Sequence, residues 1–578
     1  MQAISTAFRK LSRYAVTALL TISLGIADTS KISPDLLPLL SNPSNSVNVI
    51  VQYNSAPQQT CSGGGLLGLG GLLCTVVGVV EGVVKVVFSL LNIVSMTLSA
   101  GNVVTLSNQS NVNYISLDRT VAGSLDYTAA AVSAPYAWSS GLDGSGVGVA
   151  IIDSGIYSHP DLSSRSGSGS RVVYRQSFIG GSKYDDFGHG THVAGIVGGN
   201  GYTSSKPGSF RLLKGMAPNA NLLDLRVLDQ NGASTDSIVI AAIQKAVQLK
   251  SKYNIRVINL SLGRPIYESC TKDPLCQAVE AAWNNGIVVV TAAGNLGRNG
   301  YSTILSPGNS PHAITVGAMK TEATMSTSDD LIASYSSRGP TFIDLTAKPD
   351  VVAPGNLVVS LLAPGSTLAT EYPGNVTPSS YYTTSTYQNS PAYFQLSGTS
   401  MATPVVSGAV ALMLQKDPTL NPDTVKARIM KTAGKTFPVA SVAVDPTTGL
   451  AYTDTYDMFT VGAGYVNIEE ALENYDRAYG SSASPQVTYN SLQRMAYVIA
   501  NPSLIWFSSP TWGEAASWGT TVLVPGPSGS NAVWGSAAAW GTAASWGTAA
   551  SWGTAASWGT AASWGTAAAW GTSTQGEK

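Results

Sequence analysis

The chain has few charged residues. Asp, Glu, Lys and Arg make up 11% of its 578 residues, whereas about 25% is usual for soluble domains. The formal net charge is −1, so no excess of positive charge attracts nucleic acid or an anionic membrane, and we expect no nucleic-acid partner. The many Gly, Ser, Thr and Ala residues favour an extracellular protein rich in loops. The length accommodates a large catalytic domain with accessory segments.

Cysteine is also scarce, with four residues in the chain. They form two close pairs, Cys61 with Cys74 and Cys270 with Cys276. Neither pair has the C-x-x-C spacing of a zinc or redox site. We therefore predict two local disulfides, which need an oxidising compartment.

The apolar run near the N-terminus is too short to span a bilayer comfortably. Three basic residues between positions 9 and 13 precede this run, which covers 14–26, and small residues stand at 25 and 27. The pattern predicts a signal peptide over residues 1–27 and a secreted, extracellular protein. The alternative is a membrane-anchoring or amphipathic N-terminus.

Residues 28–127 are predicted to form a small α+β domain. Alternation predicts strands at 47–53 and 112–119, and the segments 83–98 and 102–106 are rich in β-forming residues. Residues 61–80 are uncharged and rich in glycine, which favours a loop. A membrane-active hairpin is the alternative for that stretch.

An unbroken apolar run, residues 146–152, ends at Asp153 and a glycine turn. Such a run is typical of a buried parallel strand, and catalytic groups gather at the carboxyl ends of such strands. Asp153 is therefore a candidate catalytic acid. A helix cap or turn acid is the structural alternative.

His189 lies between two glycines, just before apolar residues that predict a helix. The chain has only four histidines, and His192 follows at i+3, so a metal pair must be considered. The motif lacks the Glu of H-E-x-x-H, and no further Cys or His cluster completes a coordination shell. A candidate catalytic base is the preferred interpretation of His189.

Strands and helices alternate over the next hundred residues, which predicts an α/β fold with a parallel sheet flanked by helices on both faces. Asn295 directly follows a predicted strand in a glycine-containing turn, where a catalytic edge would lie. An ordinary turn asparagine is the alternative. The expected strands are 221–228, 257–263 and 286–295, and the expected helices are 234–249 and 274–285.

Ser400 stands at the start of an apolar segment, 401–414, that predicts a buried helix. Pro404 suits the first turn of that helix. A hydroxyl at this place lies beside free backbone N–H groups and the positive end of the helix dipole, so Ser400 is a candidate nucleophile. A capped core helix is the alternative.

The four candidates occur in the motifs V-A-I-I-D-S-G, G-H-G-T-H-V-A-G, A-A-G-N and S-G-T-S-M-A-T-P, in the chain order Asp, His, Asn, Ser. These motifs and their order closely resemble those of the subtilisin-like serine proteases, the subtilase family. The resemblance covers residues 140–475, within a predicted catalytic domain at 128–475. Residues 46–119 resemble, less specifically, the inhibitory propeptide of that family. Lesser matching motifs are H-P-D-L at 159–162, N-L-S-L-G at 259–263, D-V-V-A-P-G at 350–355 and G-A-G-Y-V-N at 462–467.

The resemblance implies a serine endopeptidase made as a self-processed precursor. His189 would take the Ser400 hydroxyl proton and later give it to the leaving amine, and Asp153 would hold the imidazole and stabilise its charge. Asn295 and the Ser400 N–H would bind the oxyanion. No cofactor is required for this chemistry. A structural calcium ion is common in the family, but its ligands here are unknown, and Asp161 serves equally well as a turn residue.

The substrate would be a protein or peptide. Residues Ser261, Leu262 and Gly263 resemble the strand that pairs with an extended peptide, and Ala292, Ala293 and Gly294 would line the first specificity pocket. Small residues there predict an open pocket, and the absence of an acidic group predicts a broad preference favouring apolar or aromatic side chains. A Cys270–Cys276 disulfide would stiffen the adjacent loop.

Residues 476–511 are predicted to be a linker, and 512–578 a repeat tail. From Trp534 to Trp570 tryptophan recurs every six residues in the pattern W-G-[TS]-A-A-[SA]. An even period keeps every tryptophan on one face of a strand. The repeats would stack, bind a glycan or cell surface, or stay disordered until they meet a partner. The competing function is a surface-binding or assembly protein whose protease activity serves only its own maturation.

Overall fold

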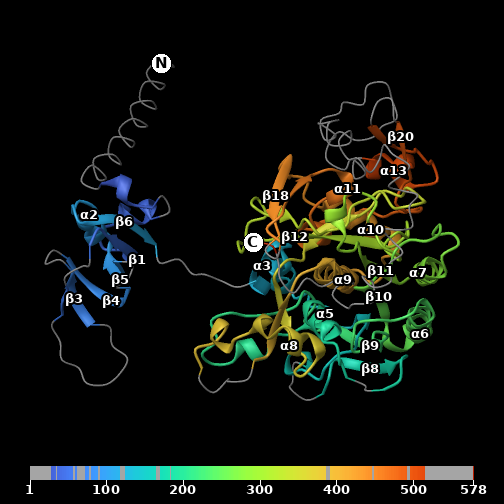
Figure 1. Ribbon diagram of the computed structural model, residues 1–578, viewed down its shortest axis with the longest axis horizontal. Coiled ribbons are helices and arrows are strands. Elements are labelled where there is room, and N and C mark those ends of the chain that lie inside the picture. Colours follow the sequence, from blue (N-terminus) through green and yellow to red (C-terminus); the bar gives the residue numbers. More distant parts are fainter. Residues whose placement is uncertain are drawn as a thin grey trace, which may run out of the picture. The chain divides into compact units, whose positions relative to one another are not determined.

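The computed structural model describes residues 28–33, 36–55, 59–61, 72–76, 80–88, 92–117, 124–164, 169–181, 184–385, 391–445, 448–490, 495–513 and 577. The predicted signal peptide and residues 514–576 of the predicted tail lie outside this part of the chain. The chain forms two compact units, divided between Val121 and Ala122 (Figure 1). The division falls six residues before the boundary predicted at 127/128.

The first unit is an antiparallel sheet with one described α-helix. Its strands lie in the order β2-β3-β4-β5-β1-β6. In β1 the odd-numbered residues from Val47 to Tyr53 are buried and the even-numbered residues are more exposed, as the predicted alternation requires. The elements are β1 (Ser46–Tyr53), β2 (Gln59–Cys61), β3 (Leu72–Val76), β4 (Val80–Phe88), β5 (Ile93–Ser99), α2 (Ala100–Ser107) and β6 (Val112–Leu117).

Two segments of this unit differ from the sequence interpretation. Residues 102–106 belong to helix α2 rather than to a β-rich segment, because the Ser99 side chain accepts a hydrogen bond from the Asn102 N–H and caps the helix. The glycine-rich stretch begins and ends in paired strands, in which Cys61 and Cys74 are register partners.

The second unit contains a mixed, mostly parallel sheet in the order β13-β12-β11-β10-β7-β9-β8, with β14 paired to β12. The predicted α/β arrangement is confirmed, except that β13 runs antiparallel to β12. All six residues of β7 are buried, as expected for a strand covered on both faces. The strands are β7 (Gly148–Asp153), β8 (Val172–Ser177), β9 (Asn221–Arg226), β10 (Ile255–Leu260), β11 (Val288–Ala292), β12 (Ile314–Lys320), β13 (Leu331–Ile332) and β14 (Val351–Pro354).

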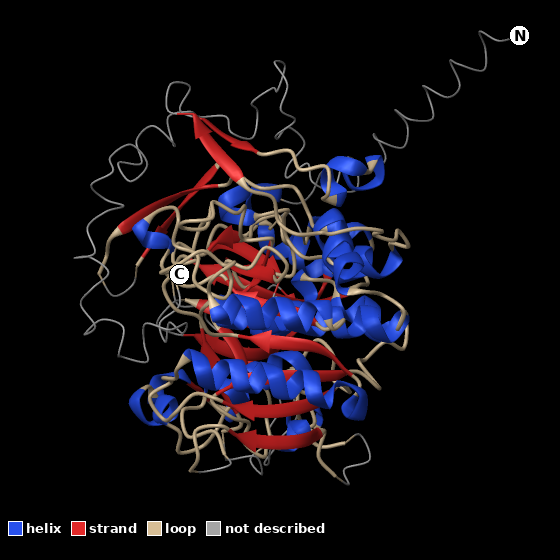
Figure 2. Cartoon of the chain, turned by 90° about the vertical axis from the view of Figure 1, so that its right-hand side faces the viewer, coloured by secondary structure: helices blue, strands red, loops and turns tan. Residues whose placement is uncertain are grey.

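Helices cover both faces of this sheet (Figure 2). Val149 and Ile151 of β7 pack in one hydrophobic core with α5 and α9. Ala150 and Ile152 point the other way, into a second core with α6 and α7. The helices of the unit are α3 (Ser124–Ala131), α4 (Ala134–Ser139), α5 (His189–Gly198), α6 (Asp236–Tyr253), α7 (Pro274–Asn284), α8 (Thr367–Glu371), α9 (Thr399–Lys416), α10 (Pro422–Thr432), α11 (Met458–Val461) and α12 (Ile468–Glu473).

The described residues of the segment expected to be a linker, 476–511, pack into the second unit, to which they belong. Leu504, Ile505 and Trp506 are buried in the larger core, as is the first repeat tryptophan, Trp512. The Trp506 indole N–H donates to the Ala483 carbonyl at 2.8 Å. Further short elements are β15 (Val358–Leu361), β16 (Val376–Thr377), β17 (Tyr393–Leu396), β18 (Ala440–Val444), β19 (Ala451–Thr455), β20 (Val487–Asn490), β21 (Met495–Val498), α13 (Ile505–Ser508) and α14 (Pro510–Gly513).

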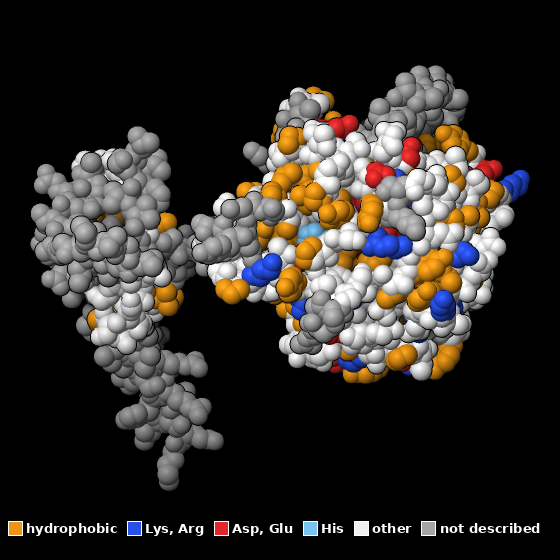
Figure 3. All heavy atoms as spheres, turned by 90° about the horizontal axis from the view of Figure 1, so that it is seen from below, with side chains coloured by type: hydrophobic (Ala, Val, Ile, Leu, Met, Phe, Trp, Pro, Cys, Tyr) orange, Lys and Arg blue, Asp and Glu red, His pale blue; other side chains and the backbone are white. Residues whose placement is uncertain are grey.

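Charged side chains are sparse on the surface in Figure 3, and hydrophobic ones are interspersed among uncharged polar groups. The exposed large apolar side chains include Phe210, Leu212 and Tyr267. Within the described ranges, none of the helices combines the length and apolar character needed to cross a membrane.

Candidate active site

Asp153 and His189 form a buried pair at the carboxyl end of β7, an inner strand of the sheet. Asp153 is the last residue of β7, and His189 is the first residue of α5. The His189 Nδ1 atom lies 2.7 Å from Asp153 Oδ1, and the two residues are 3% and 0% exposed. Burial disfavours the imidazolium, but the Asp153 carboxylate outweighs this and raises the pKa of His189. The structure thus unites the predicted acid and base.

Glycine is required where α5 meets the end of β7. A Cβ atom at Gly190 would lie 2.2 Å from the Gly155 carbonyl oxygen. Gly188, on the other side of His189, has φ of 102°, a conformation that L side chains rarely adopt. The two glycines that flank His189 therefore allow the helix to begin against the strand end.

Asp185 connects the segments that carry Asp153 and His189, and sequence reasoning missed it. Its carboxylate accepts hydrogen bonds from the Ser154 hydroxyl (2.7 Å), the Gly188 N–H (2.7 Å), the Thr191 N–H (2.8 Å) and the Thr191 hydroxyl (2.6 Å). Burial raises the pKa of Asp185 despite these bonds. Its position just before the histidine motif, three residues before Gly188 and six before Thr191, is the signal that could have indicated a cap.

Ser400 is the second residue of α9, so its N–H is among the first four of the helix, which have no intrahelical partner. The Ser400 hydroxyl donates to the Ser261 carbonyl at 3.2 Å, and the Ser261 hydroxyl donates to the Ser400 carbonyl at 2.9 Å. Among the described residues, Ser400 is thus hydrogen-bonded to Ser261 rather than to His189.

Pro404 lies inside α9, not in its first turn as predicted. Because proline has no N–H, it cannot donate to the carbonyl four residues earlier, which is that of Ser400. This carbonyl accepts the Ser261 hydroxyl instead. The proline therefore contributes to the link between the start of α9 and the segment after β10.

Asn295 lies beside the start of α9, and its amide has a defined orientation. The Oδ1 atom accepts hydrogen bonds from the Thr399 N–H at 2.9 Å and the Thr399 hydroxyl at 3.0 Å. The Nδ2 atom is buried and has no hydrogen-bond partner among the described residues. A buried donor without a partner is costly, and this one lies next to the segment that carries Ser400. Thr399 was not identified from the sequence.

The predicted substrate-binding residues lie at or just after the ends of β10 and β11, which are neighbours in the sheet. Ser261, Leu262, Ala292 and Ala293 are buried. Leu305, which sequence reasoning also missed, lies against the two glycines of this set. A Cβ atom on Gly263 would lie 3.0 Å from the Leu305 side chain, and one on Gly294 only 2.7 Å from it. The leucine therefore occupies the space that the two glycines leave.

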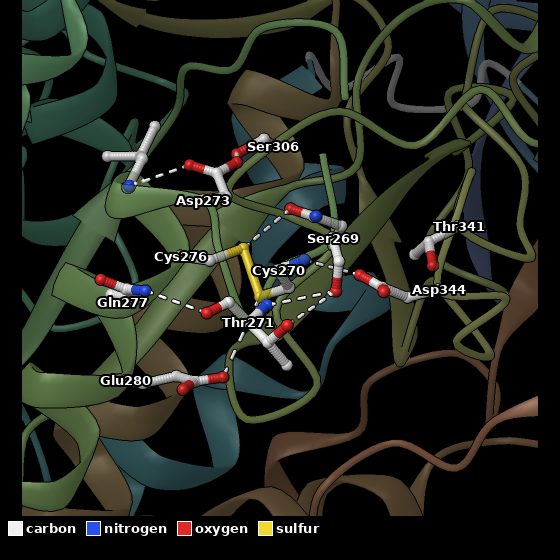
Figure 4. Close-up of a disulfide and its surroundings, with 12 residues drawn as sticks. Ser269, Cys270, Thr271, Asp273, Cys276, Gln277, Glu280, Ser306, Thr341 and Asp344 are labelled. Carbon is white, nitrogen blue, oxygen red and sulfur yellow. Dashed lines mark hydrogen bonds between the residues drawn. A yellow bond between two sulfur atoms is a disulfide. The ribbon is translucent and has the colours of Figure 1, made fainter. Parts of the chain in front are cut away.

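A disulfide joins Cys270 and Cys276, with Cα atoms 5.3 Å apart, in the loop before and at the start of α7 (Figure 4). Asp273 in this loop accepts hydrogen bonds from the Leu275 N–H and from the Arg264 guanidinium. It also accepts the Ser306 hydroxyl at 2.8 Å. The loop is thereby anchored to the residue after Leu305.

The side chains of His192 and Asp161 are hydrogen-bonded to other segments of the second unit. His192 Nε2 lies 3.0 Å from the carbonyl oxygens of Val358 and Phe394, and burial lowers its pKa to about 3. Asp161 accepts the Thr203 N–H at 2.8 Å and the Tyr393 hydroxyl at 2.7 Å. The described ranges contain no group of three or more His, Cys, Asp or Glu residues arranged to hold a metal ion.

Comparison with known proteins matches this region of the chain. The subtilase family profile (peptidase S8) matches residues 144–488. The serine protease AprX of Bacillus subtilis (strain 168) is 41% identical over 328 residues, which are 56% of this chain and 69% of that protein. Subtilisin DY of Bacillus licheniformis is 34% identical over 356 residues, which are 61% of this chain and 100% of that protein.

Proposed function

The chain belongs to the subtilase family and is a serine endopeptidase of protein substrates, and we propose that Asp153, His189, Ser400 and Asn295 carry its chemistry. The observation that supports these roles best is the Asn295 amide. Its oxygen is held by Thr399, next to Ser400, while its buried nitrogen has no partner among the described residues. That nitrogen is placed to donate to a group beside Ser400.

In the proposed reaction the Ser400 hydroxyl leaves the Ser261 carbonyl and gives its proton to His189 Nε2 as its oxygen attacks the scissile carbonyl. Asp153 bonds the other ring nitrogen and stabilises the imidazolium. The oxyanion is met by Asn295 Nδ2 and the Ser400 N–H, near the positive end of α9. His189 then protonates the leaving amine, and water repeats the cycle to release the acyl group. Asp185 is a positioning residue.

We infer a preference for small or medium apolar side chains on the acyl side of the cleaved bond. Leu305 fills space next to Gly263 and Gly294, which would otherwise belong to an open pocket. This narrows the broad apolar or aromatic preference expected from the sequence. Replacing Leu305 with Gly should shift selectivity toward aromatic side chains, measured as kcat/KM for peptides that differ at that residue alone.

The first unit is proposed to be an inhibitory propeptide of a secreted precursor that cleaves itself near the division between the units. Residues 129, 131 and 132 are already buried in the core of the second unit, which favours cleavage before them. N-terminal sequencing of the secreted protein tests this. Ser400→Ala should yield an uncleaved precursor, and normal maturation of that variant would contradict self-processing.

The enzymatic function is tested by casein hydrolysis with the purified protein. Activity should disappear with a serine-directed covalent inhibitor and in Ser400→Ala, where a loss on the order of 10⁶-fold in kcat is expected. Lack of activity in correctly processed protein would instead favour a role restricted to self-maturation, with the tryptophan repeats as the functional part. The expectation of a structural calcium ion is tested separately, by thermal unfolding with and without a chelator.

A further inference from the structure

Glu577 is bound in a buried site of the second unit. Its side chain is fully buried, although it belongs to the predicted repeat tail and follows the last tryptophan, Trp570. One carboxylate oxygen accepts a hydrogen bond from the Arg298 guanidinium at 2.7 Å, and the other accepts the Ser334 N–H at 2.9 Å. The Ser334 hydroxyl also donates to the carboxylate. The carboxylate is thus recognised by a cation, a backbone donor and a hydroxyl.

The main chain of Glu577 is recognised as well. Its N–H donates to Asn356 Oδ1 at 3.0 Å, and its carbonyl accepts from Asn356 Nδ2 at 2.8 Å. This paired contact satisfies both backbone groups of one residue, as an extended peptide needs when it is taken out of water. The site therefore binds an acidic residue within a peptide rather than a free anion.

The site belongs to the same segments that carry the proposed active site. Arg298 is three residues after Asn295, and the Leu357 N–H next to Asn356 donates to the Ser397 hydroxyl at 2.8 Å. The Gly398 N–H donates to the Gly355 carbonyl at 2.8 Å. The acid site and the oxyanion donors are therefore connected through a few short contacts.

The strand order places this site on one side of Asn295. Residues 261–263 follow β10, on one side of β11, which precedes Asn295. Asn356 follows β14, which pairs with β12 on the other side of β11. If a peptide's acyl half lies along 261–263, its leaving-group half runs toward Arg298 and Asn356.

We propose that Arg298, Ser334 and Asn356 form a subsite for an acidic residue on the leaving-group side of the scissile bond, and that Glu577 is its intramolecular competitor. This rests on the proposed peptidase function. Arg298 also pairs with Asp445, and its Nε donates to the Ser334 hydroxyl at 2.9 Å, so its guanidinium is held in place. Its side chain is 26% exposed, which leaves the site within reach of solvent.

The test uses full-length protein and internally quenched peptides with one acyl half and either Glu or Gln at the first, second or third leaving-group residue. With Glu577→Ala, we expect Glu to be preferred over Gln by about 10- to 100-fold in kcat/KM at one of these positions, as for a hydrogen bond to a charged group. Adding Arg298→Gln should bring this ratio near one, and Arg298→Lys should restore part of it. Arg256→Gln, on the far end of β10, controls for loss of a positive charge.

Competition by Glu577 gives a second readout that does not depend on variants of Arg298. Glu577→Ala should raise kcat/KM for the Glu-bearing peptide by about tenfold, whereas Lys578→Ala should not. The free peptide Thr-Gln-Gly-Glu-Lys should inhibit Glu577→Ala, and Thr-Gln-Gly-Gln-Lys should inhibit it about tenfold less well.

The outcomes separate the two proposals. Cleavage of Glu and Gln peptides at equal rates, with no inhibition by the acidic pentapeptide, would overturn the subsite and leave Glu577 as a structural anchor. If neither the wild-type chain nor Ser400→Ala cleaves any of the peptides, the proposed catalytic residues are overturned instead.

Discussion

Two buried charge clusters in the second unit differ in how many of their carboxylate oxygens have hydrogen-bond partners. In one, Asp350 lies between Lys348 at 2.6 Å and Lys426 at 3.1 Å, and it also accepts the Thr315 N–H and the Ser484 hydroxyl. In the other, Asp153 pairs with His189, while Asp153 Oδ2 is buried without a partner among the described residues.

The difference separates a structural cluster from the cluster that we propose to be reactive. Burial opposes the charge on Asp350, but the two lysines outweigh it and lower the pKa of this carboxyl. All the bonding capacity of its two oxygens is directed at fixed groups, so the cluster ties the start of β14 to α10 and to Ser484. Around Asp153, and at Asn295 Nδ2, capacity is left over for groups that change during a reaction.

The largest expected effect breaks the reactive pair. Asp153→Asn should lower kcat/KM by about 10⁴-fold, because an amide cannot hold the imidazole in the required tautomer or stabilise its charge. The free energy of unfolding should change far less than the catalytic activity. Casein and peptide hydrolysis measure the activity, and urea unfolding measures the stability. A large loss of stability with little loss of activity would contradict a reactive role for this pair.

The matching change in the structural cluster should act on stability. Asp350→Asn leaves two buried lysines without their carboxylate and should destabilise the protein by about 3–5 kcal/mol. Urea unfolding in a Ser400→Ala background avoids self-digestion. Asp417→Asn, in the partly exposed pair with Arg477, is the control and should cost at most about 1 kcal/mol. Equal effects of the two changes would refute a special role for the buried cluster.

Removing the free amide sharpens the comparison. Asn295→Ala should lower kcat by about 10²- to 10³-fold with KM little changed, because the lost donor acts on the transition state. A change confined to KM would show that Asn295 binds the substrate in its ground state. Asn309→Ala, which removes another buried amide with an unpartnered nitrogen in the described chain, is the control.

The smallest effect concerns pH. His189 must be neutral to accept a proton, and its pKa is raised above the ordinary 6.5, so kcat/KM should rise with pH through a midpoint above 6.5. In Asp153→Asn burial remains while the raising carboxylate is lost, so the midpoint of the residual activity should move down. A midpoint that stays in place would assign the titration to another group.

The order of motifs and the α/β alternation could be predicted because strand and helix patterns are local. The candidate positions of Asp153, His189, Asn295 and Ser400 came from such patterns at predicted strand and helix ends. Thr399 and Leu305 could not be predicted in this way, since their partners are distant in sequence. The Thr399 contact with Asn295, for example, spans 104 residues. Asp185 carries a local capping signal toward Gly188 and Thr191, but its contact with Ser154, 31 residues earlier, is not visible in that pattern.

The packing of the described residues of the segment expected to be a linker, 476–511, was missed for the same reason. Its apolar residues are spaced irregularly, and their burial depends on a surface built by residues more than a hundred positions earlier, such as Pro311, whose carbonyl accepts the Ser484 N–H. Composition alone therefore favoured a linker.

The sequence by itself determined the family, the kind of chemistry and which residues stand at the ends of strands and helices, because backbone hydrogen bonding and side-chain periodicity act over a few residues. The tertiary structure alone decided which buried polar groups of the described residues are satisfied, that Leu305 lies against Gly263 and Gly294, and that Glu577 reaches Arg298. These depend on packing between distant segments, where a difference of one hydrogen bond separates a fully bonded anchor from the groups that we propose to be reactive.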